Sequence, residues 1–141
     1  MLSYKESLKI LKETNALFEG HFILSSGLHS SQYIQCAQLL SKPFMAEKIC
    51  LSLAEKIKKE FNKINLIVSP AMGGVVIGYE IGRLLKKDTI FAERVDNRFE
   101  FRRGFTIKKD SKVLIIEDVI TTGKSSLECS NLVEELGGDI I

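Results

Sequence analysis

Residues 113–126, VLIIEDVITTGKSS, place four apolar residues directly before two carboxylates and a glycine-containing turn. Unbroken apolarity is typical of a strand that is covered on both faces, as in a parallel sheet. In open sheets of this kind, ligands bind beyond the carboxyl ends of the strands, where Glu117 and Asp118 fall. The following turn enters a helix, whose free backbone N–H groups and dipole favour a phosphate. The stretch therefore predicts an anion-binding turn beside an acidic pair.

Each half of this stretch has an ordinary alternative explanation. The acids alone would be a helix cap and a surface turn, and the threonines and serines alone would be capping residues. The combination of strand, acidic pair and hydroxyl-rich turn is more specific than either half. Gly123-Lys124-Ser125 also matches the end of a Walker A loop, but that pattern requires glycine where Asp118 stands. We therefore exclude a nucleotide-binding P-loop.

The rest of the chain alternates between apolar runs and amphipathic segments, which indicates the α/β class. A Ser3–Glu6 capping box predicts a first helix with Leu8, Ile10 and Leu11 facing inward. Ser41 as a cap and Pro43 in the first turn predict a second helix, which runs to about Phe61. The expected strands are 21–24, 32–35, 66–68, 89–92 and 113–116, with the Ser25-Ser26-Gly27 turn between the first two, and further helices are expected at 75–85 and 125–136.

Two glycine features refine this pattern. Gly78 and Gly82 lie one helical turn apart and predict a thin face that lets their helix approach its neighbours closely. Gly137-Gly138 predicts the end of the last helix. Residues 139–141 then look like the opening of another strand, so we expect strands beyond this end of the chain.

The bulk composition predicts one domain over residues 1–141. The chain is 45% hydrophobic and 27% charged, and it has no linker or repeat. Its three cysteines are odd in number and far apart, which favours free thiols in a reducing compartment. The sequence has no apolar run of membrane-spanning length and no signal-peptide core, so we expect a cytoplasmic protein. A net charge of +2 does not indicate nucleic acid, although positive charge gathers between Arg94 and Lys112.

The segment EDVITTGKS resembles the 5-phosphoribosyl diphosphate signature of the type I phosphoribosyltransferases. Residues 19–33, EGHFILSSGLHSSQY, resemble the N-terminal hood of the orotate enzymes in that family. The resemblance implies a mostly parallel sheet flanked by helices, with a hood at about 1–40 and a core at 41–141 that lacks its C-terminal strands. It also implies transfer of the 5-phosphoribosyl group to orotate, a homodimer, and Mg²⁺ that arrives with the diphosphate rather than in a metal site of the protein.

The resemblance assigns roles to individual residues. Glu117 and Asp118 would hold the ribose hydroxyls, and Arg94 would bind the diphosphate that leaves. Tyr33 and Thr121 would lie beside orotate, whose carboxylate would be bound by an arginine beyond the end of this chain. The full set that would bind phosphoribosyl diphosphate is Glu117, Asp118, Val119, Ile120, Thr121, Thr122, Gly123, Lys124, Ser125, Ala71, Gly73 and Gly74.

This chain departs from the family pattern at several positions. Lys124 stands where glycine is more common, and Ser26 stands where many members have lysine. The loop after residue 91 carries arginines in place of a lysine and histidine set, so the roles of Arg98, Arg102 and Arg103 stay open. We interpret His21 and His29 as turn histidines, because no acid or cysteine lies at metal-ligand spacing.

Two other functions stay open at this point. One is a purine phosphoribosyltransferase, which the GHFILSSG segment disfavours. The other is a regulator that senses phosphoribosyl diphosphate while binding RNA or DNA through its basic cluster, because fold alone does not settle function.

Overall fold

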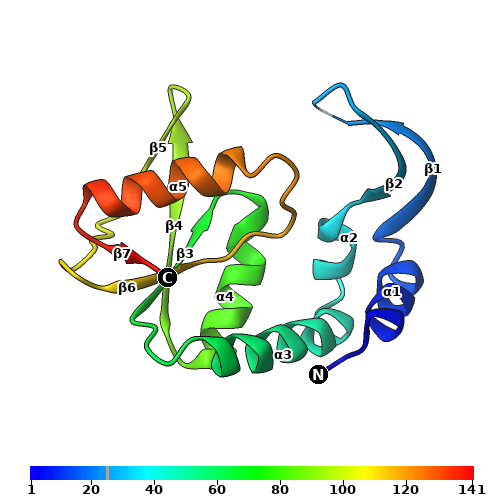
Figure 1. Ribbon diagram of the computed structural model, residues 1–141, viewed down its shortest axis with the longest axis horizontal. Coiled ribbons are helices and arrows are strands. Elements are labelled where there is room, and N and C mark those ends of the chain that lie inside the picture. The colour runs from blue at the N-terminus through cyan, green and yellow to red at the C-terminus, as the bar shows by residue number, and fades with distance from the viewer. Residues whose placement is uncertain (25) are drawn as a thin grey trace.

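The structure is a computed structural model that describes residues 1–24 and 26–141. Its centre is a five-stranded sheet in the order β5-β4-β3-β6-β7 (Figure 1). Among these strands β5 runs antiparallel to β4, and the other pairings are parallel. The α/β class is therefore confirmed. The strands are β3 (Leu66–Pro70), β4 (Asp88–Val95), β5 (Arg98–Glu100), β6 (Lys112–Ile115) and β7 (Asp139–Ile140).

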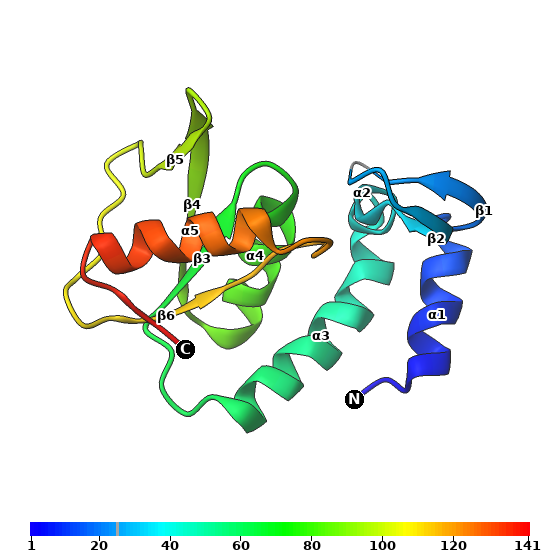
Figure 2. The same ribbon diagram turned by 45° about the horizontal axis from the view of Figure 1, so that its top comes forward.

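Helices cover both faces of the sheet (Figures 1 and 2). Helices α3 (Pro43–Glu60) and α4 (Gly73–Leu85) pack on one face, and α5 (Lys124–Glu135) packs on the other. Successive side chains of one strand alternate between the two cores, so Ile67 faces α3 and α4 while Val68 faces α5. This double burial is the reason why the strands read as unbroken apolar runs.

The N-terminal elements form a separate small layer at one end of α3. They are α1 (Tyr4–Glu13), the antiparallel hairpin of β1 (Leu17–Ile23) and β2 (His29–Ile34), and α2 (Cys36–Leu40). Ile10, Ala16, Leu39 and Ala46 make their core, and Ala46 lies on the first turns of α3. The hairpin therefore stands beside the main sheet, across from the turn that joins β6 to α5 (Figure 1).

The local signals at the helix ends were mostly confirmed. Ser3 and Glu6 form the expected reciprocal capping box, and Pro43 opens α3. Gly137 has a left-handed φ of 86°, and the Gly138 N–H donates to the Val133 carbonyl, which ends α5 as expected.

The cap assigned to Ser41 was wrong. Its hydroxyl donates to the Gln38 carbonyl and ends α2, a short helix that the sequence pattern did not predict. Lys42 takes the cap position of α3 and makes no side-chain cap bond. The hairpin strands are longer than expected. Of the turn assigned to Ser25-Ser26-Gly27, Ser25 lies outside the described residues.

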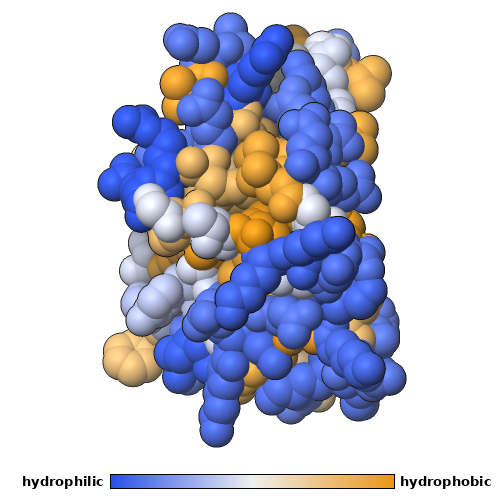
Figure 3. Space-filling view, turned by 90° about the vertical axis from the view of Figure 1, so that its left-hand side faces the viewer, coloured by the Kyte–Doolittle hydropathy of each residue, from blue (hydrophilic) through white to orange (hydrophobic). Residues whose placement is uncertain are grey.

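One side of the molecule carries the end of α5 and the sheet edge at β7. Figure 3 shows apolar residues gathered among charged ones on this side. Partly buried side chains pack against the α5 core here, among them Phe105, Ile107 and Ile140. Strand β7 has two residues and pairs with β6, so this sheet edge is only partly covered.

Helix α4 lies unusually close to the sheet through the glycine face that the sequence predicts. A Cβ atom built on Gly78 would lie 2.0 Å from Ser69 Oγ, and one on Gly82 would lie 1.9 Å from Thr89 Oγ1. Ser69 is fully buried, and its hydroxyl has no hydrogen-bond partner among the described residues. The close approach positions the start of α4, and therefore the turn before it.

We expect Gly78→Ala to destabilise the protein through this contact. Overpacking of a tight interior costs about 1–3 kcal/mol, and the better helix propensity of alanine offsets about 1 kcal/mol of that. Ser69→Ala removes the closest of these contacts and an unsatisfied hydroxyl, so the double variant Ser69→Ala/Gly78→Ala should be more stable than Gly78→Ala alone. Urea unfolding measures all three variants. Equal stability of Gly78→Ala and the double variant would contradict the proposed contact between residue 78 and Ser69.

Candidate active site

Two strand-turn-helix units open at the same edge of the sheet. Strands β3 and β6 are parallel neighbours, so their carboxyl ends lie side by side. Strand β3 leads through Ala71 and Met72, whose peptide bond is cis, into α4. Strand β6 leads through residues 116–123 into α5. The two turns predicted to bind anions therefore face the same space.

Asp118 lies directly against the first of these turns. A Cβ atom built on Gly73 would come within 2.6 Å of Asp118 Oδ1, and one on Gly74 would lie 3.0 Å from the Ile116 carbonyl oxygen. A side chain at either position would crowd this contact, so the two glycines let the two turns approach each other closely. The structure brings together Gly73, Gly74 and Asp118, which were singled out from distant parts of the sequence.

The neighbouring acid, Glu117, is held by a residue that the sequence argument missed. The Ser126 hydroxyl, on the first turn of α5, donates a hydrogen bond to Glu117 Oε2. Both residues are partly buried. The available signal was the position of Ser126 just past the turn, at a helix start where a hydroxyl meets the end of the preceding strand. Glu117 is therefore oriented by the helix whose N-terminus borders the site.

The turn before α5 is open to an anion. Gly123 takes a left-handed φ of 75° as the residue before the helix and, as glycine, cannot cap it with a side chain. The Lys124 N–H donates a long hydrogen bond, 3.4 Å, to Thr122 Oγ1. Thr121, Thr122 and Lys124 are exposed. An uncapped helix N-terminus presents unsatisfied N–H groups and a partial positive charge, which together bind phosphate well. Lys124, which departs from the family pattern, adds a further cation at this end.

Two cysteines lie close to the acidic pair, Cys36 near Asp118 and Cys129 near Glu117. The Cys36 thiol donates to the Asp118 carbonyl oxygen at 3.3 Å, and it joins α2 to the site. Burial, and then the nearby charge of Asp118, raise the pKa of Cys36 to about 11. Burial, and then the charge of Glu117, raise the pKa of Cys129 to about 12. Both thiols are neutral at physiological pH, so neither is suited to act as a nucleophile.

Arg94 lies near the end of β4, with its guanidinium group held on three sides. Nη1 donates to the Asn97 carbonyl oxygen at 2.9 Å, and Nη2 donates to Glu128 Oε2 at 2.6 Å. The guanidinium carbon lies 4.2 Å from the centre of the Phe99 ring, within the range of a cation–π contact. Glu128, on α5, was not singled out from the sequence, although it follows Lys124 by one helical turn.

Two other arginines of this region, Arg98 and Arg103, make different contacts. Arg103 forms a salt bridge with Glu93 at 2.9 Å, and this contact holds the pKa of the Glu93 carboxyl below its usual value. Arg98 lines a hollow of about 280 Å³ between the β4–β5 hairpin and α5. The hairpin turn at Asp96 and Asn97 has two left-handed residues, which is typical of tight hairpins.

A larger hollow of about 800 Å³ lies between the N-terminal hairpin and the turn after β6. Both residues expected to flank a planar substrate, Tyr33 and Thr121, line it. The Tyr33 ring lies 5.7 Å from Phe22 and 6.3 Å from Phe18, in tilted arrangements. The remaining lining is mostly apolar. A flat ring in this hollow would therefore meet aromatic side chains of the hairpin on one side and Thr121, in the turn before α5, on the other.

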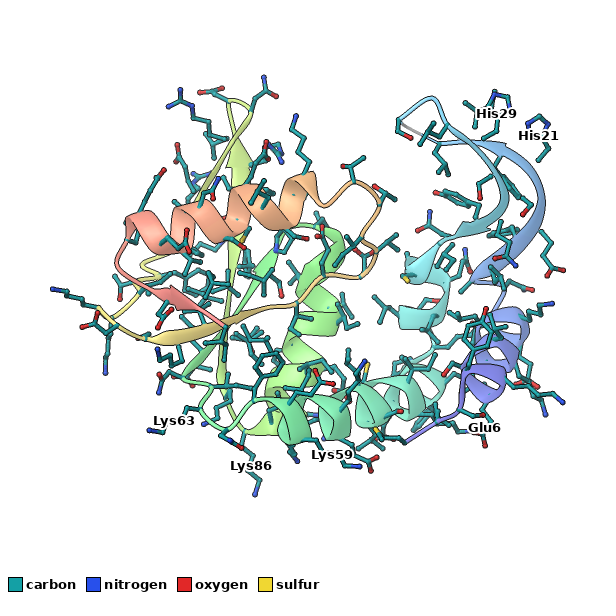
Figure 4. The ribbon with its side chains drawn as sticks, viewed as in Figure 1. Glu6, His21, His29, Lys59, Lys63 and Lys86 are labelled. Atoms are coloured by element: carbon teal, nitrogen blue, oxygen red, sulfur yellow. The ribbon has the colours of Figure 1, made fainter. Side chains whose placement is uncertain are left out.

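The interpretation of His21 and His29 as turn histidines was wrong, because His21 lies in β1 and His29 begins β2. Their rings face each other across the hairpin (Figure 4), with His21 Nε2 and His29 Nδ1 2.6 Å apart. Within residues 1–24 and 26–141, no cluster of three or more His, Cys, Asp or Glu side chains could hold a metal ion. In the same residues, no helix combines the length and apolarity needed to cross a membrane.

Known proteins resemble this chain in both sequence and structure. The family model of the phosphoribosyl transferase domain matches residues 37–141. An orotate phosphoribosyltransferase from Carboxydothermus hydrogenoformans is 47% identical over 133 residues, which cover 94% of this chain and 70% of the relative.

Solved structures share the fold at lower identity. UMP synthase from Leishmania donovani matches with a TM-score of 0.80 and 23% identity, over 96% of this chain and 29% of its own length. Adenine phosphoribosyltransferase from Saccharomyces cerevisiae matches with a TM-score of 0.75 and 20% identity, over 95% of this chain and 85% of its own.

At these low identities the solved structures show only the fold, which the orotate and adenine enzymes share. The 47% identity to the Carboxydothermus hydrogenoformans protein places this chain with the orotate enzymes. The chain has the type I phosphoribosyltransferase fold and belongs to the orotate phosphoribosyltransferases.

Proposed function

We propose that this protein transfers the 5-phosphoribosyl group from 5-phosphoribosyl 1-diphosphate to orotate, a step of pyrimidine biosynthesis that yields orotidine 5'-monophosphate and diphosphate. The observation that carries the proposal is the contact of Asp118 with Gly73. It supports the proposal because the Asp118 carboxylate, which can accept hydrogen bonds from sugar hydroxyls, follows β6 and lies against the start of α4. The 47% identity to an orotate phosphoribosyltransferase supports the choice of substrate.

Each part of phosphoribosyl diphosphate has a complementary group at this edge. Glu117 and Asp118 accept hydrogen bonds from the ribose 2- and 3-hydroxyls. The N–H groups of the Thr121–Ser125 turn and the start of α5 bind the 5-phosphate. Residues 71–74 offer backbone N–H groups to the diphosphate, and Arg94 adds a charged donor. Orotate occupies the hollow lined by Tyr33 and Thr121.

The reaction needs no protein nucleophile. The bond between the anomeric carbon and the diphosphate oxygen breaks, and a ring nitrogen of orotate, which gives up its proton to solvent, bonds to the same carbon. The electron pair leaves with the diphosphate, and positive charge develops on the sugar. Paired carboxylates near the sugar stabilise that charge, and Arg94 stabilises the charge on the leaving group. Binding all parts in one geometry supplies much of the rate enhancement.

Magnesium fits this site as an ion bound mainly by substrate. Mg²⁺ prefers oxygen ligands and usually keeps water molecules, with one or two carboxylates and substrate phosphates. The half-buried Asp118 carboxylate lies against Gly73, in the turn at residues 71–74 that we assign to the diphosphate, and could supply an oxygen ligand. When bound with the diphosphate, the ion would neutralise the charge of the leaving group.

Orotate-dependent release of diphosphate tests the proposal. The assay uses protein expressed from the complete reading frame, with phosphoribosyl diphosphate and Mg²⁺, and compares orotate with adenine and guanine. Release with orotate, and little with the purines, is the expected result. Release with a purine alone would show that the base was assigned wrongly. An absence of turnover with all three bases would sink the proposed function.

The regulator that binds nucleic acid is less well supported by the contacts of the basic cluster. Arg94 pairs with Glu128 and Arg103 pairs with Glu93, so two of its cations are matched by carboxylates of the same chain. Nucleic-acid binding of that type would weaken steeply with salt. A salt-dependent affinity for RNA without orotate turnover would favour the regulator.

We also propose a cytoplasmic location on the basis of the cysteines. Cys36, Cys50 and Cys129 are free thiols, and Cys50 and Cys129 are buried. Free, unpaired cysteines are typical of proteins in a reducing compartment.

We further propose a homodimer that uses the outer face of α4. Met72, Val76 and Tyr79 are spaced by about one helical turn along this face and are 84%, 55% and 69% exposed. Neighbouring apolar side chains that are exposed together are typical of interaction surfaces. This face begins at the diphosphate turn, so a second copy there would lie close to the site.

Tyr79→Glu should convert the dimer into a monomer, because a buried carboxylate without a partner is costly at an interface. Tyr4→Glu is the matched control, since Tyr4 is 80% exposed on α1. Sedimentation velocity measures the oligomeric state of both variants. A dimer that survives Tyr79→Glu would place the interface elsewhere.

A further inference from the structure

Helix α5 contacts two of the charged residues assigned to the site and carries a third, Lys124. Ser126 donates to Glu117, and Glu128 pairs with Arg94 at 2.6 Å. The same Glu128 carboxylate lies 3.8 Å from the ammonium group of Lys124, which begins the helix. One carboxylate is therefore shared between the cation at the phosphate turn and the cation assigned to the diphosphate.

Arg94 depends on Glu128 for its orientation. The guanidinium carries five N–H groups in a rigid plane, so fixing two of its nitrogens fixes the directions of the rest. Asn97 and Phe99 belong to the same β4–β5 hairpin as Arg94, so their contacts do not orient the guanidinium relative to α5. Glu128 is the contact that ties the guanidinium to α5, the helix that borders the phosphate turn.

We infer that Glu128 is a positioning residue for the transfer reaction, an inference that rests on the proposed function. Its carboxylate holds the Arg94 guanidinium so that the remaining N–H groups are directed at the diphosphate. It acts through Arg94 and does not touch the substrate. Because the charge of the leaving group grows as the bond breaks, a well-oriented Arg94 matters more in the transition state than in the bound substrate.

If the Glu128–Arg94 ion pair were an ordinary surface salt bridge with no role in the reaction, a different result would be expected. Both side chains are about one-third exposed, and pairs of that kind contribute little to folding. Their removal would leave turnover unchanged. A loss of turnover without a loss of stability therefore separates positioning from a structural role.

The experiment compares Glu128→Ala and Glu128→Gln with Glu134→Gln, an exposed position on the same helix. We expect Glu128→Ala to lower kcat on the order of tenfold, with a smaller rise in KM for phosphoribosyl diphosphate. Glu128→Gln retains a hydrogen-bond acceptor and should lose less. Glu134→Gln should match the unaltered protein, and thermal melting should show all variants folded.

A double-variant cycle with Arg94→Ala tests whether Glu128 acts through the guanidinium. If it does, Glu128→Ala has little further effect once Arg94 is absent. A full additional loss in the Arg94→Ala background would overturn the inference. Unchanged turnover in Glu128→Ala would also overturn the inference. Faster turnover with tighter substrate binding would overturn it too, because it would mean that Glu128 competes with the diphosphate for Arg94.

Binding of inorganic diphosphate with Mg²⁺, measured by calorimetry, separates this inference from the proposed function because it requires no orotate. We expect Glu128→Ala to weaken diphosphate binding, and to do so only when Arg94 is present. That result without orotate turnover would sink the function while keeping the role of Glu128. If Glu128→Ala leaves the affinity for diphosphate unchanged, Glu128 does not position Arg94, whatever the rate of orotate turnover.

Discussion

Asp118→Asn should leave the protein folded and lower turnover on the order of 100- to 1,000-fold. The asparagine side chain has nearly the same shape, so the partly buried position and the contact with Gly73 are kept. What is lost is the negative charge beside a sugar that becomes positive in the transition state. One of the two acceptor oxygens is also replaced by a donor, which cannot accept a bond from a ribose hydroxyl.

The measurement is kcat for orotate with protein from the complete reading frame. Asp88→Asn is the matched control, because Asp88 is exposed at the opposite end of β4 and should be replaceable without loss. Thermal melting of both variants checks the fold. A nearly normal rate for Asp118→Asn would show that this carboxylate does not hold the sugar.

Gly73→Ala should lower turnover on the order of 10- to 100-fold, because the new methyl group must share space with a carboxylate. The added Cβ would lie 2.6 Å from Asp118 Oδ1 and 2.7 Å from Oδ2, closer than atoms can approach. Either the carboxylate or the diphosphate turn must move. Stability should change little, because alanine is a better helix former than glycine at the start of α4.

The double variant Gly73→Ala/Asp118→Asn checks the mechanism of this loss. If Gly73→Ala acts by displacing the Asp118 side chain, it should add little once the carboxylate has been replaced. Rates for both single variants and the double variant complete the cycle. Strictly additive losses would mean that the methyl group disturbs diphosphate binding by another route.

The sequence predicted the elements that carry the site because their signals are local. The apolar run before Glu117, the glycines at 73 and 74 and the capping box at Ser3 each lie within a few residues of the structure they specify. The same reasoning failed at Ser41, whose hydroxyl ends α2 instead of starting α3. A serine between two possible helices can serve either one, and only the packing of α2 decides which.

The residues that hold the site in place were missed for a related reason. Ser126 has only a weak local signal, its place at a helix start, and Glu128 follows Lys124 by one helical turn, a spacing that many exposed helices share. Glu128 meets Arg94 across 34 positions, and Cys36 meets Asp118 across 82. Such contacts depend on where β4, α2 and α5 are placed by the two cores of the sheet.

By itself, the sequence determined the α/β class, the acidic pair after β6 and the anion-binding character of the turn before α5, because apolar runs and turn residues specify backbone geometry locally. The role of the turn at residues 71–74 was expected from the family resemblance. Only the tertiary structure decided that Asp118 rests on Gly73, that Tyr33 and Thr121 line one hollow, and that Glu128 holds Arg94. The reason is that parallel strand order and helix packing, which no short stretch encodes, bring the carboxyl ends of distant strands to one edge.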